Sequence, residues 1–182
     1  MKKIFSSVYL LLPVLLFITC DKQPSLQSYF VEKLEDPSFL IVNIPFQLEN
    51  IFSENLTQEE LKAVSNIGKL NLLVYRPKEN QVQLLKKNLK TVEQLLENKR
   101  YQNLMEFKAF DKGQGSFLFE GEKDQIEEGI VFVSIPGSGF GLLRILGTDI
   151  NPLVLSKLIK KIDLSLLEKE ITATRSGLSS FL

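Results

Sequence analysis

The hydrophobic pattern changes from a helical period to a period of two near the middle of the chain. Between Glu79 and Arg100, apolar residues recur three and four positions apart, which predicts one long amphipathic helix. From Leu104 onward apolar and charged residues alternate, with Phe107 standing between Glu106 and Lys108. This alternation predicts a strand with one buried face, on which Phe107 points inward and Lys108 points to solvent. The chain therefore combines helices with a sheet.

Three further strands follow this first one at short intervals. Glycine-containing turns at residues 111–115 and 121–124 separate the apolar runs, and short turns favour antiparallel neighbours. The sequence predicts a four-strand antiparallel meander over residues 104–146, with later strands at Ser116–Glu120, Gly129–Ile135 and Gly141–Leu146.

The first half of the domain predicts two strands with a helix between them. The strands are Ser38–Ile44 and Lys69–Arg76. Between them, Thr57 and Glu60 have the spacing of a capping box, which marks a helix N-terminus. We expect a right-handed β-helix-β unit. The fold class predicted for the whole chain is α+β: a single domain with a mixed sheet of about six strands and helices mainly on one face.

The C-terminal region begins with another predicted helix, opened by Asn151-Pro152. Residues 28–163 are expected to form the α+β domain, and residues 164–182 a helical or frayed tail. In that tail Leu164, Leu167 and Ile171 fall on one helical stripe. The stripe either packs on the domain's own sheet or docks as a helix in the groove of a partner.

The N-terminal residues Met1–Cys20 have the layout of a secretory signal peptide. Lys2 and Lys3 precede an apolar run, Ile4–Ile18, that ends at Thr19-Cys20. The alternative is a membrane-spanning anchor, but the run is shorter than the roughly 20 residues that a span needs. We therefore predict a signal for export.

Cys20 stands where a lipid anchor would be attached. The stretch Phe17-Ile18-Thr19-Cys20 resembles the lipobox of bacterial lipoproteins, although Ile18 replaces a small residue. This resemblance implies a lipoprotein signal peptide over residues 1–20, with lipid on Cys20. The alternative is a cysteine that merely ends the signal. Residues 21–27 are polar and contain Pro24, and we expect them to form a tether between the lipid and the domain.

The composition removes several classes of function. The chain has no histidine and a single cysteine, Cys20, so histidine-dependent triads and His/Cys zinc sites are excluded. Because Cys20 would be acylated, we also expect no free-thiol nucleophile. The formal net charge is zero, which argues against binding of nucleic acid. We expect no metal and no cofactor. The catalytic groups that remain are carboxylate pairs and Ser/Lys dyads.

Three local motifs have structural interpretations. Pro136–Gly141 is rich in glycine, but a strand follows it where a phosphate loop needs a helix, so it predicts a hairpin turn. Arg144 lies among aliphatic residues and is expected to be ion-paired or at an edge, with anion binding as the alternative. Glu59 and Glu60 lie in the first turn of a helix, where acids favour the helix dipole.

The order of these elements resembles a known family. The phrases Ser38–Pro45, Leu70–Tyr75, Phe117–Phe119 and Leu142–Asp149 follow one another as in domain of unknown function 4252, which occurs in exported lipoproteins of Bacteroidetes-type bacteria. The similarity extends over roughly Ser25–Asp163. It implies an exported, lipid-anchored α+β domain and implies no established activity.

From these observations we expect a cell-envelope lipoprotein that is a non-enzymatic binding or regulatory module. It would be anchored to the inner or outer membrane through lipid on Cys20, with its domain in the periplasm or at the cell surface, and its partner would be an envelope protein. The alternatives are a carrier or sensor of an apolar ligand held between sheet and helices, and a carboxylate- or Ser/Lys-based hydrolase.

Overall fold

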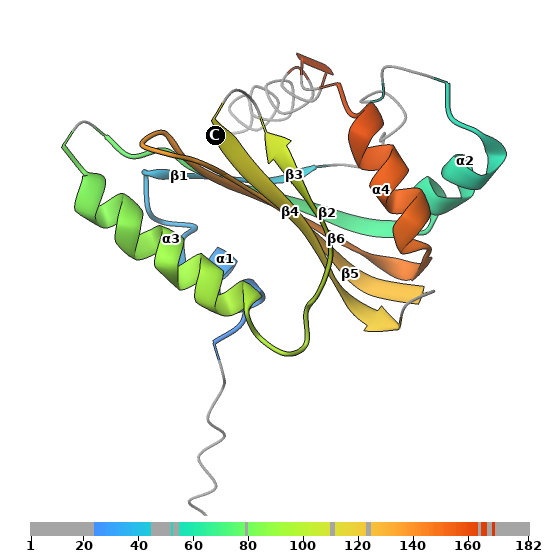
Figure 1. Ribbon diagram of the computed structural model, residues 1–182, viewed down its shortest axis with the longest axis horizontal. Helices are drawn as coiled ribbons and strands as arrows, with labels where there is room; N and C mark the ends of the chain where they lie inside the picture. The colour runs from blue at the N-terminus through green and yellow to red at the C-terminus, as the bar shows by residue number, and fades with distance from the viewer. Residues whose placement is uncertain are drawn as a thin grey trace, which may run out of the picture.

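One six-stranded sheet with helices on both faces makes up the domain (Figure 1). The computed structural model describes residues 24–44, 52, 55–78, 80–109, 112–122, 125–163, 165–166 and 169. The strand order is β1-β2-β6-β5-β4-β3. In chain order the elements are α1 (Leu26–Glu32), β1 (Phe39–Ile44), α2 (Gln58–Ser65), β2 (Ile67–Tyr75), α3 (Val82–Leu96), β3 (Gln102–Ala109), β4 (Gly113–Glu122), β5 (Gln125–Ile135), β6 (Gly139–Ile150) and α4 (Pro152–Lys161).

The predicted α+β class and the meander are confirmed. Strands β3 to β6 pair in sequence as antiparallel neighbours, and β6 then pairs with β2, which leaves β1 and β3 at the two edges. The turn between β5 and β6 contains Pro136–Ser138, as the glycine-rich motif predicts, and Ser138 donates its amide to the carbonyl of Ile135 at 3.0 Å. The strands are longer than the predicted ones because the register continues through β-bulges.

The expected β-helix-β unit is wrong in its strand direction. Strands β1 and β2 are antiparallel neighbours, with Ile44 beside Leu70 and Phe39 beside Tyr75. A parallel pair needs a helix that runs back along the whole strand. Helix α2 has eight residues and is about 12 Å long, whereas the six residues of β1 extend for about 20 Å. Helix α2 does not make this return, and β2 begins beside the end of β1, with Leu70 next to Ile44.

The expectation of helices mainly on one face is also wrong. Helices α1 and α3 pack on one side of the sheet, and α2 and α4 on the other. We call these the α3 face and the α4 face. The interior strand β2 explains the arrangement, since Leu70 joins the core under α4 and Leu73 joins the core under α3. A strand that is apolar on both sides needs cover on both sides.

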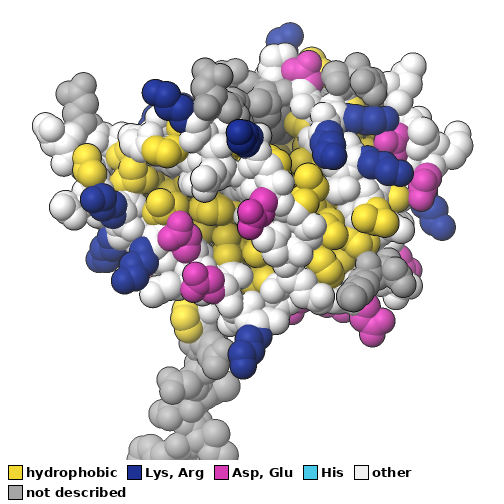
Figure 2. Space-filling model, in the orientation of Figure 1, with side chains coloured by type: hydrophobic (Ala, Val, Ile, Leu, Met, Phe, Trp, Pro, Cys, Tyr) yellow, Lys and Arg dark blue, Asp and Glu magenta, His cyan; other side chains and the backbone are white. Residues whose placement is uncertain are grey.

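The helix starts follow the capping residues in the sequence. The Thr57 side chain accepts the amide of Glu60 while the Glu60 carboxylate accepts the amide of Thr57, so the predicted capping box is confirmed. Asn151 caps α4, whose first residue is Pro152. In Figure 2 hydrophobic side chains are visible between the sheet and the flanking helices, and charged side chains are spread around the outside.

Candidate functional site

An apolar cleft occupies one end of the α4 face. Helices α2 and α4 cover the other end of this face, where Ile145, Phe117 and Ile150 are buried. Beyond the last turn of α4 the sheet has a hollow of about 650 Å³. Its apolar lining comes from β2, β3, β5, β6 and the C-terminal end of α4: Leu72, Val74, Phe107, Ala109, Val131, Val133, Ile135, Leu143, Ile159 and Ile162.

Glycines on two strands help to make the hollow. Alternate residues of a strand share a face. On the α4 face this rule places Gly113 and Gly115 of β4 in line with Phe117, and Gly139 and Gly141 of β6 in line with Leu143. Both strands therefore contribute no side chains at this end. Val133 of β5 pairs with a glycine on each neighbouring strand.

The aromatic ring of Phe107 lies over Gly115. A Cβ atom added to Gly115 would come within 2.3 Å of this ring, so the glycine is needed for the close approach. The predicted phase of β3 is confirmed, because Lys108 is exposed while Phe107 lies on the α4 face. Phe107 is only half-buried, however, and it lines the cleft where the sequence predicted a buried face.

The rim of the cleft has two polar side chains at the end of β2 and in the β5–β6 turn. Arg76 follows the last residue of β2, is exposed and lies beside the cleft together with Ser138. Among the described residues, no carboxylate forms an ion pair with Arg76. The cleft thus combines an apolar floor with one cationic group at its edge.

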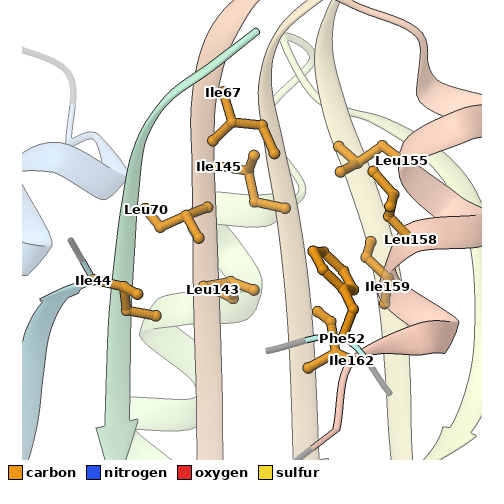
Figure 3. A pocket seen from close by; sticks show the side chains of 10 residues that line it. All are labelled: Ile44, Phe52, Ile67, Leu70, Leu143, Ile145, Leu155, Leu158, Ile159 and Ile162. Carbon is orange, nitrogen blue, oxygen red and sulfur yellow. The ribbon is translucent and has the colours of Figure 1, made fainter. Parts of the chain in front are cut away.

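A smaller void of about 30 Å³ lies next to the cleft, under α4 (Figure 3). Side chains from β1, β2, β6 and α4 surround it, together with Phe52 and Ile162, which form an isolated β-bridge. A space of this size could hold one water molecule only with polar partners, and all the lining side chains are apolar. Leu143, Ile159 and Ile162 border both spaces, so the end of α4 separates void from cleft.

A group of charges lies on the α3 face. Arg144 donates from Nε to Oε1 of Glu128 at 2.5 Å, and Arg100 lies 3.7 Å from the same carboxylate. Arg100 also contacts Glu120. The prediction that Arg144 is ion-paired is confirmed. The Glu128 side chain is only 4% exposed, and a buried carboxylate needs such partners. This group has the features of a structural ion-pair network.

A second buried carboxylate joins α2 to α4. Glu60 accepts the amide of Thr57 and also binds the Nζ of Lys161 at 2.9 Å. Hydrogen bonds from Lys161 and from the Thr57 backbone lower the pKa of Glu60 to about 2. The first-turn acid thus has the structural role that the sequence indicates, with an added contact to α4.

Replacing Glu60 with glutamine should change the acid sensitivity of the fold. The folded-state pKa of Glu60 is lowered from 4.5 to about 2, so its stabilising effect is fully present above pH 4.5. This effect is lost as the pH falls toward 2. Glu60→Gln should therefore be less stable than the wild type at pH 7, with a difference that shrinks between pH 4.5 and 2.

Urea midpoints at several pH values measure this difference. The matched control is Glu59→Gln, because Glu59 is exposed on the same turn of α2. Glu59→Gln removes a first-turn acid that has no contact with Lys161, so at pH 7 it should lose much less stability than Glu60→Gln. A Glu60→Gln curve that runs parallel to the wild-type curve from pH 7 to pH 2 would contradict the assigned ion pair.

The remaining sequence-based site lies outside the described residues. Cys20 and the rest of residues 1–23 belong to that part, as do most residues of the predicted tail. Within the described part of the chain, no group of acidic side chains is arranged to hold a metal ion. No helix in this part has the length and apolar character needed to cross a membrane.

Sequence reasoning missed the residues of the cleft. The signal that was present is the alternation of glycine at residues 113 and 115 and again at 139 and 141. Two strands with missing side chains at matching positions indicate a hollow once their register is known.

Comparisons with known proteins give a family match. A family model described as Domain of unknown function (DUF4252) matches residues 29–158. No curated protein and no solved structure matches the chain.

Proposed function

The chain belongs to the DUF4252 family, and from this premise we propose that it is a lipid-anchored, non-enzymatic binding module of the cell envelope. Lipid on Cys20 would be joined to the domain by a tether shorter than the predicted residues 21–27. Ser25 caps helix α1 and Leu26 is buried in the core, so the domain begins before residue 28. The domain would then bind its partner in the cleft of the α4 face. Its partner in this proposal is an apolar segment of an envelope protein.

The observation that carries this proposal is the cleft itself. Ligand sites are typically hollows of about 300–1,000 Å³ with apolar walls and a few polar groups. The cleft has a volume of about 650 Å³, apolar walls and two polar side chains at its rim. Its floor is a paired β-sheet, which gives a binding surface a rigid base.

The ionisable side chains support a binding role over catalysis. The buried carboxylates Glu60 and Glu128 each pair with a cation. The pKa of Glu60 is lowered, and so is that of Asp163, which accepts hydrogen bonds from Ser165 and Leu166. A general acid needs a raised pKa. Both shifts thus favour carboxylates that are permanently charged and serve structure.

A second candidate function is the binding of a small amphiphile, which Arg76 favours. A molecule with an apolar chain and an anionic head would place the chain on the sheet and its head beside this guanidinium. Mass spectrometry of lipids extracted from the purified protein distinguishes the two candidates. Arg76→Gln should lower lipid recovery if the occupant is an anionic amphiphile, and should leave it unchanged if the occupant is a protein segment.

Val133→Glu should reduce the capture of envelope partners. The side chain of Val133 is half-buried in the cleft between Gly115 and Gly141, so a carboxylate has room there but cannot pair with an apolar ligand. Bringing an apolar group against an unpaired charge costs more than about 1.4 kcal/mol, so recovery should fall about tenfold or more. The measurement is a pull-down from chemically crosslinked envelopes.

The control is Gln94→Glu, which adds the same charge on the exposed side of α3. It should recover the same proteins as the wild type. Thermal melting of both variants checks that they fold. Equal recovery by Val133→Glu and the wild type would place the binding surface away from the cleft.

A further inference from the structure

The chain continues from the rim of the cleft into another helix. Ile162 lines the cleft and pairs with Phe52, and Asp163 follows it. The Asp163 Oδ1 accepts the amide of Ser165 at 2.8 Å and the amide of Leu166 at 3.3 Å. These contacts are those of an N-cap, and Ser165, Leu166 and Lys169 are helical. The helix thus begins beside the apolar hollow.

The described residues of this helix define its solvent side. Ser165 and Lys169 are exposed and lie one turn apart, whereas Leu166 is half-buried. At about 100° per residue, positions 167 and 171 point roughly 200° away from positions 165 and 169. Leu167 and Ile171 therefore belong on the side opposite Ser165 and Lys169. If the helical period continues from the described residues, the stripe predicted from the sequence, which also includes Leu164, would face away from solvent.

The length of the segment fits the cleft. Residues 164–176 precede Gly177 and would form a helix of roughly 20 Å. The cleft extends from β2 to β3, which are separated by four strand spacings, or about 19 Å. An apolar stripe of this length is long enough to cover the half-buried valines and isoleucines of the cleft floor. Left open, such an apolar patch would be unfavourable.

We propose that the C-terminal segment, residues 164–182, is the resident occupant of the cleft and lies with its Leu164–Leu167–Ile171 stripe on the α4 face. The segment then acts as a covering helix for the binding site. One consequence rests on the proposed function: a partner binds in the cleft by displacing the chain's own helix. Partners with a longer or more apolar segment than the covering helix are selected.

Thiol crosslinking in the full, membrane-bound chain tests this placement. Val133→Cys is combined with Leu167→Cys or Ile171→Cys, and each pair is treated with dibromobimane, a short crosslinker that fluoresces when both of its ends have reacted. The control pair is Val133→Cys with Lys169→Cys, whose second thiol lies on the exposed side. Val133→Cys alone controls for any reaction with Cys20.

We expect intramolecular crosslinks in most molecules of at least one stripe pair, and few in the control pair. Equal crosslinking of the Lys169→Cys pair, or none in either stripe pair, would overturn the placement. Crosslinks between two chains would show instead that the segment docks on a partner, which also overturns it.

The proposed function is judged separately. The pull-down with Val133→Glu uses a chain that contains no added cysteine, so its result does not depend on the crosslinks. Val133→Glu and the wild type could recover equal amounts of partner while the stripe pairs crosslink. In that case the covering helix stands and the binding role is wrong. If both hold, the crosslinked chain should recover several-fold less partner than the uncrosslinked chain, because its cleft is permanently filled.

Discussion

Replacing Cys20 with serine is expected to move the protein out of the lipid-anchored fraction. The change removes the thiol to which acyl chains would be attached. Each buried methylene contributes about 0.8 kcal/mol to membrane binding, so several acyl chains account for firm anchoring. Cys20→Ser should lose all labelling by a palmitate analogue. It should either leave washed membranes or, if the signal remains uncut, migrate as a larger precursor.

Metabolic labelling followed by membrane washing measures both effects. Gln23→Ser is the matched control, because it makes a similar polar change in the proposed tether and leaves the thiol in place. It should be labelled as the wild type is. A wild-type protein that takes up no palmitate analogue, with unchanged mobility of Cys20→Ser, would contradict lipid anchoring.

Phe117→Ala is expected to cause a large loss of stability. Phe117 lies on β4 at 0% exposure, in the core under α4. Removing a fully buried ring leaves a cavity in a close-packed region, and such changes cost about 3–5 kcal/mol. Leu153→Ala is the control, because Leu153 is 63% exposed on α4 and its truncation should cost less than about 0.5 kcal/mol. Denaturant unfolding compares the two variants.

Equal unfolding midpoints for Phe117→Ala and Leu153→Ala would mean that the α4 face is not the packed core of the domain. The comparison is informative because both residues belong to the same face of the fold, one beneath α4 and the other on its solvent side.

Local features of the fold were predictable from the sequence because their causes are local. The capping box of Thr57 and Glu60 and the Asn151-Pro152 start of α4 each depend on residues within one turn. The alternation around Phe107 and Lys108 gave the correct phase of β3 for the same reason. In such segments the side-chain spacing alone determines which face is buried.

The arrangement of these elements depended on contacts far apart in the sequence. Whether β1 and β2 are parallel depends on where the chain returns to the sheet after α2, which contacts α4 through Glu60 and Lys161. The partner of Arg144 depends on the register of β5 and β6, which shifts between Ile126 and Glu128. The cleft depends on glycines of two strands that β5 separates. None of these pairings has a local sequence signal.

The central claim is that the cleft of the α4 face binds a partner, and photo-crosslinking from its floor tests it most directly. A benzophenone amino acid is placed at Val133 in the anchored protein, and at Gln94 on the exposed side of α3 as the reference. After irradiation of intact cells, we expect a discrete adduct with an envelope protein or a lipid from position 133, and none of comparable yield from position 94. Attachment to the chain's own C-terminal segment is expected as well, because that segment is proposed to cover the cleft. The same adducts from both positions, or no adduct with another molecule from position 133, would contradict the claim.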